Sequence, residues 1–166
     1  AFEIVNPKFN HDYINYKKVW KSVNQKDWIV IGYIRENSND SVFFMNKNKE
    51  EGLIYNFNVQ IGDTIMINNT NFNQSYSVNT IVADIYDTII NQTNRKILIL
   101  KDTLGNSKEK WIEGIGSLNG IIETGYCFYQ IVGSEPNLLS YKEKGIEVFK
   151  NNSVGEYCFC EICNNI

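Results

Sequence analysis

The sequence is poor in alanine and proline, and it contains a single histidine, His11. Alanine, the strongest helix former, occurs only twice among 166 residues, which argues against a helical fold. No apolar run approaches the roughly 20 residues of a membrane-spanning helix. The net charge of −3 is also not the lysine and arginine surplus of a general nucleic-acid-binding protein. We therefore expect neither a membrane span nor a nucleic-acid partner.

The abundant residues are those that favour strands and turns. Short runs rich in Ile, Tyr and Phe end at Asn, Gly, Asp or Lys, while only residues 13–20 show a weak helical spacing. Short strands separated by frequent turns predict an all-β fold, either an antiparallel β-sandwich or a barrel. We expect strands at residues 28–35, 42–45, 53–57, 64–67, 76–90, 96–101, 109–115, 121–124, 127–132, 138–141, 146–149 and 157–162.

Two hairpins and one central strand can be predicted in more detail. Residues 84–90 and 95–101 flank an Asn- and Thr-containing loop, and residues 138–141 and 146–149 flank a turn that contains Gly145. The run at residues 28–35 is apolar on both of its alternating faces, which predicts a central strand covered on both sides.

The length predicts one domain over residues 1–166, because domains usually hold about 100–200 residues. Its core is expected at about residues 20–150. A short extension precedes this core, and a cysteine-rich tail, residues 151–166, is expected to be anchored by disulfides.

The four cysteines favour two disulfides over the alternatives. They are Cys127, Cys158, Cys160 and Cys163, and an even count allows three pairings, one of which joins Cys127 to Cys158 and closes a small loop between the other two. Free thiols and a four-thiolate zinc site are the competing interpretations, although zinc usually binds two separated Cys pairs or added His. Disulfides and a first residue Ala1 are typical of a processed, exported protein, so we expect an extracellular or cell-surface location.

No pattern predicts a catalytic or cofactor-binding residue. The glycines between Trp111 and Gly120 have the wrong spacing for a dinucleotide fingerprint and are expected to form a bulge and a turn. There is no Gly-x-Ser-x-Gly elbow, and one His makes a poor triad. We expect a structural motif made of Trp111, Glu113, Gly114, Gly116 and Gly120, with no cofactor and no metal.

Glu113 is the one carboxylate that invites an enzymatic hypothesis. Glycoside hydrolysis needs a second carboxylate at a set separation. The sequence does not place Glu123, Asp84 or Asp87 near it. The simpler interpretation is that Glu113 accepts backbone N–H bonds at a turn.

Four of the seven aspartates precede Ser or Thr and then an aliphatic residue. A turn that ends in Asp before a strand explains the pattern by β-propensity alone. The triplet also resembles the O-glycosylation acceptor of exported Bacteroidota proteins, so the candidate acceptors are Ser41, Thr64, Thr88 and Thr103.

Several longer segments occur in the order of a known module. They are residues 53–64, 95–97, 111–120, 138–141 and 145–148, and the most specific is Trp-Ile-Glu-Gly-Ile-Gly-Ser at 111–117. Over about residues 28–158 the chain resembles a secreted β-rich module of uncharacterised exported Bacteroidota proteins, many of which carry a type IX secretion sorting domain. Ser140 stands where relatives often have cysteine. The resemblance implies an extracellular or surface location and supplies no catalytic residues.

The sequence thus predicts a secreted or cell-surface, non-enzymatic module, a structural, adhesive or protein-binding part of an extracellular assembly. Its expected partners are other extracellular or surface proteins, which can pair with exposed sheet edges, and glycans. The alternatives are a glycan-binding module with an exposed aromatic platform, for which Trp20 and Tyr126 are candidates, a hydrolase that uses Glu113, and a lipocalin-like carrier with an apolar cavity.

Overall fold

The computed structural model describes residues 4–5, 16–22, 26–72, 77–105, 108–128, 136–143 and 145–152. In these residues the structure consists of strands and one short 3-10 helix, so the predicted all-β class is confirmed. The elements are β1 (Ile4–Val5), β2 (Lys17–Ser22), β3 (Trp28–Glu36), β4 (Ser41–Asn46), β5 (Glu51–Asn56), β6 (Thr64–Ile67), β7 (Val78–Ile90), β8 (Thr93–Asp102), β9 (Lys108–Ile112), β10 (Gly116–Ser117), η1 (Tyr126–Phe128), β11 (Ser140–Glu143) and β12 (Ile146–Lys150).

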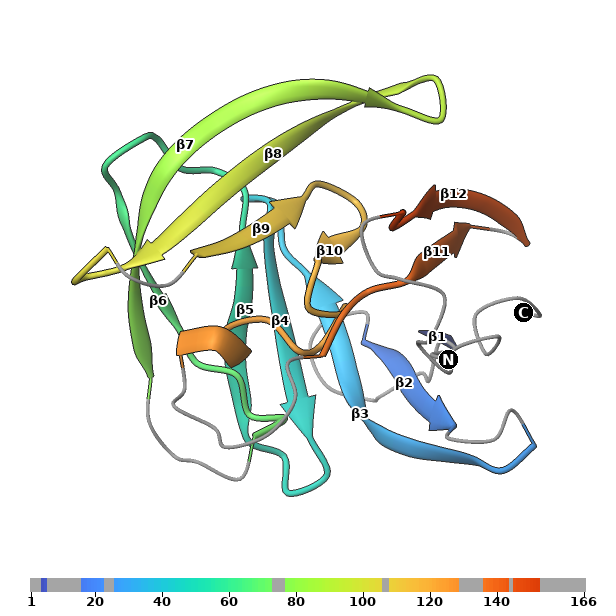
Figure 1. Cartoon of the computed structure of the whole chain (residues 1–166). Helices are drawn as coiled ribbons and strands as arrows, with labels where there is room; N and C mark the ends of the chain where they lie inside the picture. Colours follow the sequence, from blue (N-terminus) through green and yellow to red (C-terminus); the bar gives the residue numbers. More distant parts are fainter. Residues whose placement is uncertain are drawn as a thin grey trace.

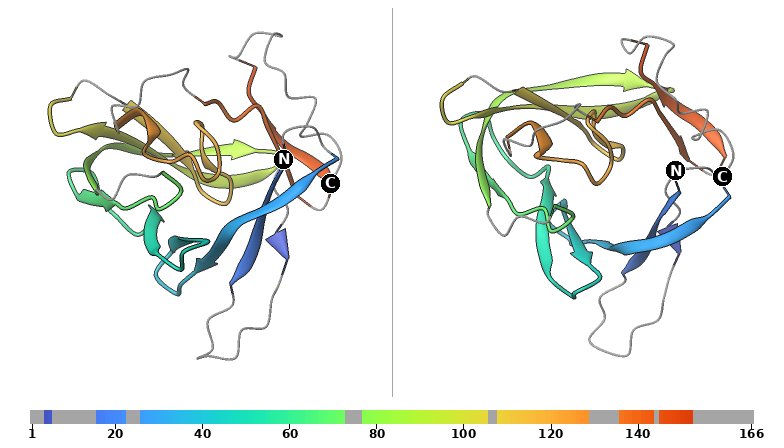
Figure 2. Two further views of the ribbon diagram at one scale, coloured as in Figure 1. Left: turned by 90° about the horizontal axis from the view of Figure 1, so that it is seen from below. Right: turned by 60° about the horizontal axis from the view of Figure 1, so that its bottom comes forward.

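Two antiparallel meanders form the body of the molecule. Sheet A runs in the order β1-β2-β3-β4-β5, sheet B in the order β10-β9-β8-β7-β6, and β11 and β12 form a separate hairpin (Figure 1). The pairing leaves one extra residue in each of β3, β5 and β7, namely Ile31, Ile54 and Ala83, and such bulges bend and twist a strand. The two sheets therefore curve around an interior that holds the chain between β9 and η1 (Figure 2).

Both predicted hairpins are present, and the first is tighter than expected. Strands β7 and β8 are joined by Asn91 and Gln92, which have φ of 47° and 63°. Positive φ at both central residues is the geometry of a type I′ turn, whose twist matches that of the flanking strands. The second hairpin, β11–β12, turns at Gly145, where φ is 80°.

Strand β3 is central, as predicted, but it is not covered on both sides. It lies between β2 and β4, with Ile34 buried on its inner face. Ile29 pairs with Lys21 of β2, on the same face of the sheet as the buried Val19, and yet it is 57% exposed. The prediction of cover on both sides is therefore wrong at this end of the strand.

The segment with weak helical spacing is also extended. Residues 17–22 form β2, in which Val19 and Ser22 are both buried. These two buried positions are three apart, as they would be on one face of a helix.

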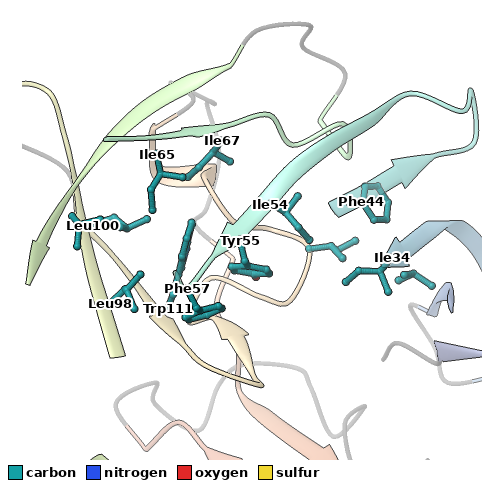
Figure 3. Packing of buried hydrophobic residues seen from close by; sticks show 13 residues of the cluster. Ile34, Phe44, Ile54, Tyr55, Phe57, Ile65, Ile67, Leu98, Leu100 and Trp111 are labelled. Carbon is teal, nitrogen blue, oxygen red and sulfur yellow. The ribbon is translucent and has the colours of Figure 1, made fainter. Parts of the chain in front are cut away.

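The main core lies between the two sheets. Trp111 of β9 contacts Tyr55 edge-on, with ring centroids 5.0 Å apart, and Phe57 packs against both rings (Figure 3). Leu98 and Leu100 of β8 and Phe44 of β4 are fully buried in the same cluster. A second cluster joins Ile97 and Ile112 of sheet B to Leu138 beside the β11–β12 hairpin.

The segment of residues 113–125, which we call the inner loop, replaces a predicted strand. Residues 121–124 were expected to pair in a sheet, but they form turns, and Ile122 and Thr124 are buried. The prediction is wrong here because side chains from other strands satisfy this backbone in place of a ladder. Figure 2 shows the loop inside the curve of the two sheets.

A close backbone contact joins the two sheets at β5. The Asn68 backbone N–H, just after β6, donates to the Leu53 carbonyl at 2.9 Å. Gly52 makes this approach possible, because a Cβ at that position would overlap the Asn68 carbonyl oxygen. Gly in a strand often marks such a close approach.

We predict that Gly52→Ala destabilises the protein by about 3 kcal/mol or more, since the clash is with backbone that cannot move aside. Gly105→Ala is the matched control, because its Cβ meets nothing within 4 Å and only the left-handed φ of 80° is strained, at about 1–2 kcal/mol. Urea unfolding of both variants measures the difference. Equal losses would contradict the proposed role of Gly52.

An ion pair fixes the outer face of sheet A. Arg35 of β3 donates from Nε and Nη2 to the two oxygens of Glu51 on β5, at 2.7 and 2.5 Å, and stacks 4.1 Å from the centre of the Phe43 ring. The Tyr16 hydroxyl donates to the same carboxylate at 2.5 Å. Partial burial opposes ionisation of Glu51, but the hydrogen bonds from Arg35 and Tyr16 outweigh it and lower the pKa of the carboxyl below its ordinary value.

We predict that Glu51→Gln lowers the free energy of unfolding by about 1 kcal/mol at pH 7. Because the folded pKa of Glu51 is depressed, this stabilisation is present above the unfolded value near 4.5 and is lost as the pH falls through the folded value. Denaturant unfolding from pH 7 to pH 3 should therefore show the two proteins converging in acid. A difference in unfolding free energy that stays constant over this range would refute a stabilising role for the Arg35–Glu51 ion pair. So would an equal loss of stability in Glu147→Gln, whose side chain is exposed on β12.

Candidate functional site

A cleft of about 310 Å³ opens between sheet A, the inner loop and β11. Apolar side chains from β3, β4 and β5 line it together with Ile115 and Ile121 of the inner loop. Tyr55 and Phe57 belong to this lining and are also core residues, so the wall on that side is a rigid part of the main core. The remaining lining residues are Ile34, Glu36, Asn37, Asp40, Val42, Glu113, Gly114, Gly116 and Tyr141.

Three carboxylates and no cation belong to the lining of the cleft. Glu36 ends β3, Asp40 lies in the β3–β4 turn, and Glu113 lies between β9 and β10. The ion pairs found within the described parts of the chain involve other acids, namely Glu51, Glu123 and Glu143. The cleft thus combines an apolar lining with a concentration of negative charge.

The β3–β4 turn places Asp40 through its own hydrogen bonds. The Asn37 side-chain oxygen accepts from the backbone N–H groups of Asn39 and Ser41, both at 3.0 Å. Asp40 has a φ of 53°, a left-handed conformation that Asp tolerates better than most residues, and its carbonyl accepts from Phe57 N–H at 3.0 Å. The position of Asp40 therefore depends on backbone bonds and does not depend on its carboxylate.

Two basic side chains of β8 donate hydrogen bonds to backbone carbonyl groups of residues that line the cleft. Arg95 Nη1 donates to the Glu113 carbonyl at 2.9 Å, and Lys96 Nζ donates to the Phe57 carbonyl at 3.0 Å. The Glu113 carboxylate accepts from the Lys96 backbone N–H at 3.2 Å, which is a backbone contact as expected but comes from β8 and not from the turn itself. A Cβ on Gly114, where φ is 71°, would overlap the Arg95 guanidinium.

Tyr141 of β11 closes the cleft on the far side. Partial burial raises the pKa of its hydroxyl, and the nearby charge of Glu143 raises it further. The charge of Arg95 lowers this pKa and that of Glu36 raises it, so both groups lie within electrostatic range of the Tyr141 hydroxyl. Arg95 is itself 11% exposed, and its Nε has no hydrogen-bond partner among the described groups.

Behind the cleft, the inner loop is held by buried polar side chains. The Tyr55 hydroxyl accepts from Ser117 N–H at 2.9 Å and donates to the Ile121 carbonyl at 2.6 Å. The Asn69 amide donates to the carbonyls of Ile122 and Thr124, at 2.9 and 2.8 Å. These bonds replace the strand pairing that the loop lacks.

Glu109 of β9 is the other anchor of the inner loop, and the sequence did not single it out. Trp111 Nε1, the Thr124 hydroxyl and Gly125 N–H donate to its carboxylate at 2.8–2.9 Å. Burial raises the pKa of this carboxyl, although the hydrogen bonds from Ser117, Trp111, Gly125 and Thr124 oppose the rise. Its only sequence signal is the alternation of β9, which turns residue 109 inward with Trp111.

The structure places Glu123, Asp84 and Asp87, the carboxylates considered as catalytic partners of Glu113, away from the cleft. Glu123 lies 3.7 Å from Lys21 Nζ and accepts from the Asn71 amide, and burial raises its pKa. Asp84 and Asp87 are exposed on β7. None of the three lines the cleft. The neighbours of Glu113 there are Glu36 and Asp40, which the sequence analysis did not select.

The predicted structural motif forms the β9–β10 hairpin and the inner loop. Trp111 is fully buried, and Gly116 and Gly120 have φ of 111° and 128°. A Cβ on Gly116 would crowd the Tyr55 hydroxyl. These glycines therefore permit the backbone to approach the core aromatic residues.

The predicted modification sites differ in their exposure. Cys127 lies in η1, with its sulfur 3.6 Å from a Glu109 oxygen, while Cys158, Cys160 and Cys163 lie outside the described residues, as does the tail from residue 153 onward. Ser41 is only 8% exposed. Thr64 and Thr103 are exposed, and Thr88 is half-buried. Disulfide formation and glycosylation stay predictions.

The described residues contain no helix that is both long and apolar enough to cross a membrane, and they bring together no group of three metal-ligating side chains. No protein-family model, curated protein or solved structure matches the chain. The chemistry of the cleft is therefore the basis on which a function is proposed.

We predict that Glu109→Ala destabilises the protein by about 3–5 kcal/mol, because it leaves the buried Trp111, Thr124 and Gly125 donors without their acceptor. Thermal unfolding followed by near-ultraviolet circular dichroism also reports on the Trp111 environment. The control is Glu147→Ala on exposed β12, where we expect a change within about 0.5 kcal/mol. A similar small change for Glu109→Ala would show that the inner loop does not depend on this anchor.

Proposed function

We propose that the chain is an exported, non-enzymatic binding module whose cleft receives a group presented by a partner protein. The observation that carries the proposal is the combination, at one cleft, of an apolar lining with three carboxylates that form no ion pair with a described cation. Ligand sites are typically concave and mostly apolar, with a few polar groups that fix orientation. The extracellular setting rests on the cysteine pattern and the family resemblance.

Binding is favoured over hydrolysis by the position of the perturbed carboxyl groups. A general acid at neutral pH needs a raised pKa. The carboxyl groups whose pKa burial raises, Glu109 and Glu123, are engaged in hydrogen bonds of the inner loop and do not line the cleft. The acids with a raised pKa are therefore not placed to protonate a ligand in the cleft.

A glycan is the second candidate ligand, favoured by the amide and carboxylates beside the Tyr141 ring. Sugar binding usually needs an open aromatic face. Tyr55 and Phe57 are 3% and 5% exposed, and neither Trp20 nor Tyr126 lines the cleft. Only Tyr141 remains as a platform, which makes a protein partner the stronger proposal.

The test is selection from a displayed library of random peptides against the folded chain. We expect enriched peptides that bind the wild-type protein and lose at least tenfold in affinity for Glu36→Trp, which places an indole across the cleft. Glu36 is exposed at the end of β3, so this variant should fold. Lys47→Trp, in the exposed turn at the other end of β4, is the matched control and should bind like the wild type.

Two outcomes would overturn the proposal. One is that no peptide is enriched over an unrelated β-protein. The other is that the enriched peptides bind Glu36→Trp as well as the wild type, which would place the interaction on another surface. Circular dichroism of each variant confirms that a loss of binding does not reflect unfolding.

A further inference from the structure

We propose that the occupant of the cleft is an arginine side chain of the partner protein. The inference rests on the proposed function and gives it a chemical identity. It follows from three properties of the cleft, namely its size, the distribution of its charges and the wall formed by Tyr141.

The size and lining of the cleft fit one long side chain. Its volume of about 310 Å³ lies at the lower end of the ~300–1,000 Å³ of ligand pockets, so it has room for a single side chain and not for a folded segment. Ile34, Val42 and Ile121 offer aliphatic surface. Arginine and lysine carry an aliphatic stem that packs on such surface while the charged head stays near water.

The charges select a cationic head. Glu36, Asp40 and Glu113 come from three separate segments and line the same cleft, so a positive charge placed among them would be attracted by all three. Within the described part of the chain, Arg95 and Lys96 form no ion pair with these three carboxylates, and each donates to a backbone carbonyl instead. A partner with the complementary charge would gain affinity and orientation from the same three groups.

Arginine suits this arrangement better than lysine. A guanidinium has five N–H donors in a planar fork and can address carboxylates on more than one side, whereas an ammonium acts as a compact point charge. Its plane also stacks on aromatic rings, and Tyr141 supplies one at the cleft wall. We therefore expect arginine to bind more tightly than lysine.

Titration of capped tripeptides into the ¹⁵N-labelled protein tests the inference. The probes are Gly-Arg-Gly, Gly-Lys-Gly and Gly-citrulline-Gly, because citrulline keeps the shape of arginine without its charge. We expect the arginine peptide to shift the amides of Asp40, Gly114 and Gly116 with a Kd of about 1 mM. Lysine should bind about threefold more weakly, and citrulline at least tenfold more weakly.

Substitution of the carboxylates provides the matched test on the protein. Asp40→Asn and Glu113→Gln should each weaken the arginine peptide about threefold to tenfold, and raising the salt concentration should weaken it further. Glu147→Gln on exposed β12 removes the same charge away from the cleft and should leave the affinity unchanged. Unshifted amides elsewhere in the spectrum show that the variants remain folded.

Three results would overturn the inference. Equal binding of citrulline and arginine would show that the charge is not used, and a response to lactose but not to arginine would make the cleft a glycan site. The absence of any shift at 20 mM arginine peptide would also reject it. If the display selection instead yields peptides that bind at the cleft but contain no arginine, the proposed binding function stands and only the arginine inference fails. The failure of the inference can thus be distinguished from the failure of the proposed function.

Discussion

The fold depends on satisfying the backbone of a loop buried between two sheets. Buried N–H and carbonyl groups without partners are costly, and the inner loop has little ladder pairing of its own. Tyr55 of β5, Asn69 after β6 and Glu109 of β9 supply the missing partners from three separate places in the chain. Each is buried, so the loop, the core aromatic cluster and the ends of the sheets form one cooperative unit.

Much of this architecture could be predicted from the sequence, and the exceptions have physical causes. The long hairpin at Asn91 and the strand Thr64–Ile67 are local features, because turn chemistry and alternation act within a few residues. The inner loop is not local. Ile121 and Ile122 favour a strand by their own propensity, and only contacts with side chains more than 50 residues away keep them out of a sheet.

The candidate site was predictable to a smaller extent. Glu113 was considered because it adjoins Trp111 and a glycine cluster, and it does line the cleft. Glu36 and Asp40 gave no signal, since acidic residues at a strand end and in a turn are what any hairpin contains. Their meeting with Glu113 depends on how sheet A curves toward the β9–β10 hairpin, and bulges such as that at Ile54 in β5 contribute to this curvature.

The carboxylate that stabilises the fold is different from the carboxylates that line the cleft. Glu109 accepts hydrogen bonds that hold the inner loop, and its removal affects the whole fold. The backbone of Asp40 is held by Phe57 and that of Glu113 by Arg95, and neutralising either carboxylate leaves these contacts in place. The Glu113 carboxylate also accepts from the Lys96 backbone N–H, a bond that an amide oxygen can still accept. Under the proposed function, substitution at Glu36, Asp40 or Glu113 would therefore change what the cleft recognises without rebuilding the core that gives the cleft its shape.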